Sequence, residues 1–206
     1  MLLPPDLSLI LASKSPRRSY LLEQAGIPFT IRTVEVDEVY PPETPVLEVA
    51  PYLARLKARA AAHLLTGDRE VLLTADSVVI LDEEIFGKPR DRDHALSTIA
   101  RLSGRRHTVV TGCCLKSNRH EDVFASTAYV YMNDISPAEA EAYVDRYRPY
   151  DKAGAYAIQE WIGLAKIRRI EGTYPTIMGL PVDLVYERLL SFTTASASFP
   201  GRTSVG

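Results

Sequence analysis

The sequence predicts an α/β protein, built either as one large domain or as two small lobes. Residues 71 to 81, VLLTADSVVIL, form the most apolar run and are typical of a central strand buried on both faces. Two further β-patterned runs, at 107–117 and 123–132, flank the polar turn NRHED and indicate a long antiparallel hairpin. Amphipathic segments with helix start and stop signals lie between the strands, so helices should cover the sheet.

Composition excludes several classes of protein. The 206 residues are 46% hydrophobic and 24% charged, as in a globular protein long enough to bury a proper core. The formal net charge of -2 leaves no general basic field for a nucleic acid or an anionic membrane, so we expect neither as a partner.

Cysteines and the N-terminal residues suggest a compartment. Cys113 and Cys114 are adjacent in a β-patterned run, so their side chains should face opposite sides, which suits neither a disulfide nor a metal site. The opening residues lack the charged region with which a leader peptide begins. Pro4 and Pro5 interrupt their apolar stretch, which is too short for a membrane span. We therefore expect a reduced, cytoplasmic protein.

The first predicted unit is a strand followed by a helix, within residues 8–26. Ser15 has the residue type of an N-cap, Pro16 suits the first helical position, and Gly26 suits the stop. The strand, the Ser-rich turn and the helix start should together form an anion site.

Two arginines at this helix start support an anion site. Arg17 and Arg18 lie where the helix dipole is positive, which is unfavourable unless a negative group lies between them. Guanidinium groups bind phosphate oxygens in bidentate fashion, and the hydroxyls of Ser13 and Ser15 could add contacts. The alternative is a pair of solvated arginines on a surface helix.

The next segment brings a carboxylate and a lysine. Residues 28–36 alternate like a strand that runs into Glu38. Residues 46–66 have apolar positions at helical spacing, although Pro51 implies either a kink or a start near residue 50. Lys57 lies in this helix and, on spacing alone, could equally be solvated.

Asp76 interrupts the apolar strand. A carboxylate there is unfavourable by several kcal/mol if it lacks a partner, so it must meet a metal, a cation or backbone donors. Alternatively, the strand ends at Ala75 and resumes after a bulge, or turn N–H groups satisfy the carboxylate. Lys88, in the extended segment GKP, could reach the same site as Asp76.

The remaining elements follow from the same kinds of signal. In chain order, we expect a helix capped by Asp91, the hairpin, a helix after Ser136, a small-residue segment with Lys152, a strand at 161–172, a turn at 173–181, a closing helix from 182, and a disordered tail at 193–206.

Together, the candidates suggest metal-assisted phosphoryl chemistry. Cations would hold phosphates, while the carboxylates of Glu38 and Asp76 would hold a divalent ion, Mg²⁺ or Mn²⁺, and orient water. The cations are Arg17, Arg18, Lys57, Lys88 and Lys152.

Several motifs in order along residues 8–192 resemble the Maf family of nucleoside triphosphate pyrophosphatases. They are LILASKSPRR, ADS at 75–77, GKP at 87–89, SGRRHTVVTG at 103–112, DKAGAYAIQE at 151–160 and GLPV at 179–182. The resemblance implies one domain over residues 1–192, with a long twisted mixed β-sheet and helices around a deep cleft, similar to the inosine triphosphatase fold. It also implies metal-dependent hydrolysis of a nucleoside triphosphate to monophosphate and pyrophosphate, often in a homodimer.

The resemblance also implies residue roles. Asp76 matches the family's proton acceptor, Glu38 its other functional acid, and Lys57 and Lys88 its two lysines, while Arg17 and Arg18 match the arginines of SPRR.

The IQ in DKAGAYAIQE resembles the subgroup acting on dTTP and UTP rather than the one that prefers methylated GTP. The specificity positions of that subgroup fall on Arg17, Ser77 and Gln159. Ser77 stands where Thr is more common, and Glu160 where Gly is usual. A non-catalytic nucleotide-binding regulator of septum formation is the alternative, but such a protein has no need of the two carboxylates.

Overall fold

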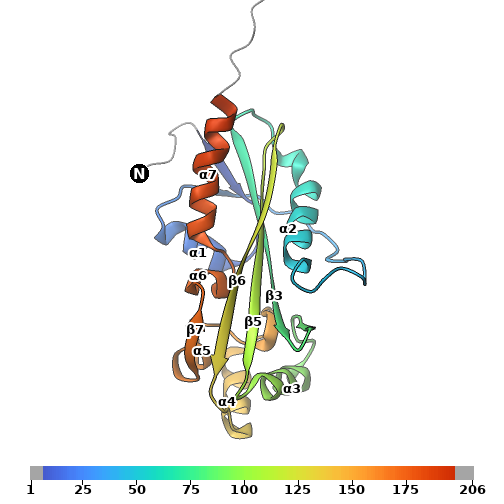
Figure 1. Cartoon of the computed structure of the whole chain (residues 1–206), viewed down its shortest axis with the longest axis vertical. Coiled ribbons are helices and arrows are strands. Elements are labelled where there is room, and N and C mark those ends of the chain that lie inside the picture. Colours follow the sequence, from blue (N-terminus) through green and yellow to red (C-terminus); the bar gives the residue numbers. More distant parts are fainter. Residues whose placement is uncertain (1–6, 198–206) are drawn as a thin grey trace, which may run out of the picture.

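A mixed seven-stranded sheet forms the centre of the molecule (Figure 1). The computed structural model describes the backbone of residues 7–197 and the side chains of residues 7–191. The strand order is β2-β1-β3-β5-β6-β7, with β4 paired to β3. The strands are β1 (Ser8–Leu11), β2 (Thr30–Ile31), β3 (Glu70–Leu81), β4 (Glu84–Phe86), β5 (Arg106–Lys116), β6 (Glu121–Met132) and β7 (Ile167–Glu171).

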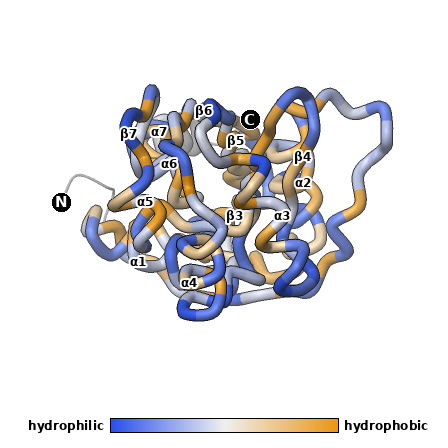
Figure 2. The backbone as a smooth tube through the Cα atoms, turned by 90° about the horizontal axis from the view of Figure 1, so that it is seen from below, coloured by the Kyte–Doolittle hydropathy of each residue, from blue (hydrophilic) through white to orange (hydrophobic). Residues whose placement is uncertain are grey.

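Helices cover both faces of this sheet, which confirms the predicted α/β class. In Figure 1, α1 and α7 lie on one side of the long strands and α2 lies on the other. The helices are α1 (Pro16–Gln24), α2 (Val49–Ala60), α3 (Arg92–Leu102), α4 (Pro137–Tyr147), α5 (Trp161–Ala165), α6 (Tyr174–Met178) and α7 (Val182–Ala197), with 3-10 turns at Ala62–Leu64 and Ala153–Ala155. Viewed from below, hydrophobic and hydrophilic positions alternate along the tube, as expected for elements that bury one face (Figure 2).

Strand β3 is buried on both faces and continuous, as predicted. Its neighbouring residues enter different cores: Leu73 packs in the cluster that includes α1 and α7, and Leu72 packs with the alanines of α2. β3 runs parallel to β1 and antiparallel to β5, and in the second pairing Asp76 is opposite Gly112. The ladder passes Asp76 without a shift in register, so neither a strand end at Ala75 nor a bulge accommodates this carboxylate.

Several helix predictions are confirmed. Asp91 caps α3 by accepting a hydrogen bond from the His94 N–H at 2.8 Å. α4 begins with a capping box, in which the side chains of Ser136 and Glu139 bond to each other's backbone N–H. α2 begins at Val49 and places Pro51 in its first turn, where the missing N–H breaks no helical hydrogen bond.

Three predicted boundaries are wrong. Within residues 28–36, only Thr30–Ile31 forms a strand. The segment lies at the edge of the sheet, and its side chains are exposed or only partly buried. Residues 161–172 divide into helix α5 and strand β7, since a short apolar run suits either structure. The expected turn after residue 172 contains the short helix α6.

The C-terminal helix extends past the predicted start of a disordered tail. α7 continues to Ala197 rather than ending near residue 192. The rest of the expected tail, 198–206, lies outside the described residues. Within the described part of the chain, no helix is both long and apolar enough to cross a membrane.

Candidate active site

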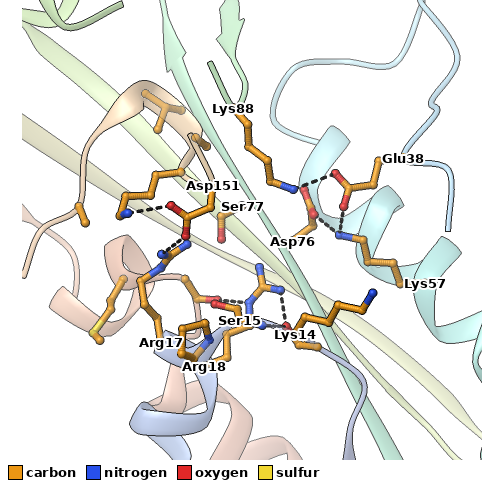
Figure 3. Close-up of a pocket in the computed structure, with 18 of the residues that line it drawn as sticks. Lys14, Ser15, Arg17, Arg18, Glu38, Lys57, Asp76, Ser77, Lys88 and Asp151 are labelled. Carbon is orange, nitrogen blue, oxygen red and sulfur yellow. Dashed lines mark hydrogen bonds and ion pairs between the residues drawn. The ribbon is translucent and has the colours of Figure 1, made fainter. Parts of the chain in front are cut away.

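All of the predicted site residues line one cleft of about 720 Å³, a size typical of small-molecule sites. The β1–α1 connection forms one wall, and α2 and the middle of β3 form the opposite wall (Figure 3). Residues from the segments 34–38, 151–159 and 177–179, together with Lys88 and Val109, complete the lining. The predicted residues brought together here are Ser13, Ser15, Arg17, Arg18, Glu38, Lys57, Asp76, Ser77, Lys88, Lys152 and Gln159.

One end of the cleft carries two carboxylates joined by a lysine. The Lys57 ammonium, from α2, contacts Asp76 Oδ1 and lies 2.8 Å from Glu38 Oε1. Lys88 Nζ approaches the other Glu38 oxygen at 3.6 Å. Figure 3 shows both lysines pointing toward the carboxylates. A cation therefore satisfies Asp76, and backbone turn groups are not its partner.

The lysine contacts keep the Glu38 carboxylate charged. Burial alone would raise the pKa of Glu38, but the hydrogen bonds and charges of Lys57 and Lys88 outweigh burial and lower it. Asp76 is only 7% exposed, so its negative charge acts where water screens it weakly.

The other end of the cleft is formed by the start of α1. Arg18 Nη1 donates to Ser13 Oγ and its Nε donates to the Gly179 carbonyl, each at 3.0 Å. Burial lowers the pKa of Arg18, although Asp76 opposes the shift. Ser15 lies at the N-cap position with extended backbone, but its side chain makes no capping bond. Instead, its N–H donates to Ser13 Oγ at 3.2 Å, so Ser15 is the predicted N-cap residue but its hydroxyl does not cap the helix.

Asp151, which the sequence analysis did not single out, joins the other two cations of this end. Its carboxylate lies 2.9 Å from Arg17 Nη1 and 2.7 Å from Lys152 Nζ. Burial alone would raise the pKa of Asp151, but bonds from Lys152 and Arg17 lower it. The only signal in the sequence is its position next to Lys152 in the small-residue segment.

Two polar groups in the middle of the cleft can recognise a ligand. Thr111 donates its hydroxyl hydrogen to the Thr176 carbonyl at 2.8 Å, so in its 2.8 Å contact with Ser77 the Ser77 hydroxyl is the donor. Ser77 therefore offers lone pairs to the cleft. Gln159 Oε1 is buried and has no hydrogen-bond partner among the described residues. An unpaired buried acceptor of this kind favours a ligand that supplies a donor.

The acidic end fits a divalent ion that also binds phosphate. Among the described residues, no group of three or more His, Cys, Asp or Glu side chains could hold a metal ion. Glu38 and Asp76 supply two carboxylates, and Mg²⁺ sites commonly combine one or two carboxylates with substrate phosphates and water. The donor set therefore suits an ion that arrives with a phosphate ligand.

Comparison with known proteins identifies the family. A family model described as Maf-like protein matches residues 8–192. The chain belongs to the Maf family. This Maf-family chain is 44% identical to a dTTP/UTP pyrophosphatase of Porphyromonas gingivalis over 186 residues, which covers 89% of this chain and 94% of that protein. It is 41% identical to one of Bacteroides thetaiotaomicron, with coverage of 88% and 94%, and 39% identical to one of Flavobacterium psychrophilum, with coverage of 90% and 94%.

A solved structure also resembles this Maf-family chain, more distantly. The Ham1 protein of Staphylococcus aureus matches 62% of this chain and 72% of its own, with a TM-score of 0.45 and 15% sequence identity.

Proposed function

We propose that the protein hydrolyses dTTP and UTP to the nucleoside monophosphate and pyrophosphate, and so removes these nucleotides from the pool. The observation that carries the proposal is the division of one cleft into a cationic end at α1 and a carboxylate end at β3. The relatives that match nearly the whole chain are named dTTP/UTP pyrophosphatases, which supports the choice of substrate.

The cationic end binds the outer phosphates. Arg17, Arg18 and Lys152 lie on one side of the cleft, where their charges would balance those of the β- and γ-phosphates. Charge that develops on departing pyrophosphate is thereby neutralised, which favours attack at the α-phosphorus.

The carboxylate end activates water. Asp76 accepts the proton of the attacking water, while Lys57 holds Asp76 and Glu38 side by side. Glu38 and Asp76 would also hold Mg²⁺ or Mn²⁺, which supplies further neutralisation of phosphate charge. A regulator that only binds nucleotides would need the arginines but not this acidic pair.

Gln159 reads the base. Uracil and thymine present an O4 acceptor beside an N3–H donor, and one primary amide offers the complementary pair. Cytosine presents the reverse order, so a Gln159 held in one orientation would leave polar groups unpaired against CTP. The unpaired Gln159 Oε1 is available for the N3–H of uracil or thymine.

We further propose that the protein acts in the cytoplasm as one domain spanning residues 1–192, and that it forms a homodimer. The reduced thiols Cys113 and Cys114 suit that compartment. Analytical ultracentrifugation of the purified protein measures the dimer directly.

The test is hydrolysis of a nucleoside triphosphate panel in ¹⁸O-labelled water. We expect UTP and dTTP to be the best substrates, with pyrophosphate released and one labelled oxygen in the monophosphate. Label in orthophosphate, with a diphosphate as product, would contradict attack at the α-phosphorus. Tight binding of UTP without turnover in the presence of Mg²⁺ or Mn²⁺ would favour the regulator.

A further inference from the structure

A tight turn carries Gln159 into the cleft. The Glu160 N–H donates to the Ala157 carbonyl at 3.2 Å, so Ile158 and Gln159 are the two central residues of a turn from 157 to 160. Ala157 and Ile158 are buried, and Gln159 lines the cleft. The orientation of the Gln159 amide therefore depends on what fixes this turn.

One buried hydroxyl joins both ends of the turn. Tyr143, on α4, accepts a hydrogen bond from the Ala157 N–H at 3.1 Å and donates its own hydrogen to Glu160 Oε2. The Tyr143 side chain is 2% exposed, and burial together with the bond to Glu160 raises its pKa, so the hydroxyl remains a neutral donor. We call the three residues Tyr143, Ala157 and Glu160 the tyrosine clasp.

Two further contacts hold the turn from other directions. Lys152 Nζ lies 3.4 Å from Glu160 Oε1, which ties the turn to the cationic end of the cleft. In addition, α5 passes so close to the turn that a Cβ on Gly163 would lie 1.8 Å from the Ile158 carbonyl oxygen. The turn is therefore held by the tyrosine clasp at its two ends and by α5, which packs against Ile158.

We propose that Tyr143 and Glu160 are positioning residues, which hold the Gln159 amide in the orientation that accepts uracil or thymine and rejects cytosine. The inference rests on the proposed function, because it takes Gln159 as the residue that reads the base. An amide that can rotate offers donor and acceptor in either order, so Gln159 discriminates between bases only while its backbone and surroundings are fixed.

Loss of the tyrosine clasp should therefore reduce the preference for UTP over CTP rather than the hydrolysis step itself. In Tyr143→Phe, the ring stays in the core, but the Ala157 N–H loses its acceptor and Glu160 loses its donor. Glu160→Gln keeps an oxygen that can accept the Tyr143 hydrogen, whereas Glu160→Ala does not. The three variants thus separate the hydrogen bond from the bulk of the side chains.

The experiment measures kcat/KM for UTP and for CTP in the full-length protein. We expect the UTP to CTP ratio to fall about 10-fold or more in Tyr143→Phe and Glu160→Ala, toward the ratio of Gln159→Ala, and to stay within about threefold of wild type in Glu160→Gln. Tyr147→Phe is the matched control, because its ring stacks on Tyr143 with centroids 4.8 Å apart but its hydroxyl is outside the clasp.

The outcomes separate this inference from the proposed function. A Tyr143→Phe protein with a normal melting curve and an unchanged ratio would overturn the inference. If Tyr143→Phe does not fold, equal ratios in Glu160→Ala, Glu160→Gln and wild type would overturn it instead. Wild-type protein that shows no preference for UTP, or releases no pyrophosphate, refutes the proposed function before any variant is made, and the inference fails with it.

Discussion

At the scale of single residues, Lys57 determines the arrangement of the acidic end of the cleft. Its ammonium contacts both Asp76 and Glu38, so two like charges can lie close together in a partly buried place. A carboxylate on a doubly buried strand is otherwise unfavourable by several kcal/mol. The position of Asp76 is therefore tolerated because a lysine from α2 reaches it.

We predict that Asp76→Asn removes turnover and leaves the fold intact. The change keeps the size of the side chain but removes the charge needed to accept a proton, so kcat should fall by about two to four orders of magnitude. Steady-state kinetics with UTP and a melting curve measure the two properties. Asp68→Asn, at an exposed carboxylate paired with Arg119, is the control and should keep wild-type kinetics. Near wild-type activity in a folded Asp76→Asn protein would show that the assigned role is wrong.

The sequence predicted which residues gather in the cleft, but not how they pair. Asp76 was recognisable because a charge inside an apolar strand demands a partner, and Arg17 because it lies at a helix start. Asp151, the partner of Arg17, lies 134 residues further along the chain, and Thr111, the partner of Ser77, lies 34 residues away from it. Contacts of this range depend on tertiary packing, which local patterns do not encode.

At the scale of elements, a close contact between α2 and β5 brings Lys57 within reach of Asp76. Gly112 is opposite Asp76 in the β3–β5 pairing, and a Cβ at Gly112 would lie 2.2 Å from the backbone nitrogen of Pro51. The helix can rest on the strand only because this position has no side chain. The distance between the lysine and the carboxylates thus depends on a residue that touches neither.

We predict that Gly112→Ala pushes α2 away from the sheet. The added methyl group should destabilise the fold by roughly 1 to 3 kcal/mol and lower kcat, because Lys57 moves with its helix. Gly67→Ala is the control, since its new Cβ would have its nearest neighbour, Glu70 Cγ, at 3.8 Å, an ordinary contact. Urea unfolding and UTP kinetics report the two effects. Wild-type stability and kinetics in Gly112→Ala would mean that the helix does not depend on this contact.

Long elements with strong patterns were predictable, and short ones were not. β3, the β5–β6 hairpin, α3 and α4 follow from burial pattern, turn residues and caps. The run at 161–172 was assigned to a strand, but its first five residues form α5, where Gly163 packs against Ile158. For segments of this length, tertiary contacts outweigh local preference.

At the scale of the whole molecule, one sheet separates two packed layers. α1 and α7 share a core with one face of the long strands, while α2 packs on the other face. The α/β class was predictable from alternating strand and helix patterns. The family resemblance implied a deep cleft, but the local patterns did not show how it is assembled, because segments from 12–18 to 177–179, far apart in the chain, converge there.

The two adjacent cysteines of β5 lie in different layers. Cys113 is buried in the cluster with α1 and α7, and Cys114 in the cluster with α2. Burial raises the pKa of each thiol to about 12, so neither forms the reactive thiolate while its layer stays closed.

The adjacent thiols of Cys113 and Cys114 therefore report separately on how often each of the two layers opens to solvent.

We predict that an aromatic disulfide reagent modifies native protein far more slowly than urea-unfolded protein. In the variants Cys113→Ala and Cys114→Ala, the remaining thiol reports one layer alone. A nucleotide present at 100 times its Kd should slow modification about 100-fold wherever labelling requires global unfolding. Rapid labelling of either single-thiol variant in its native state would show that its layer is open.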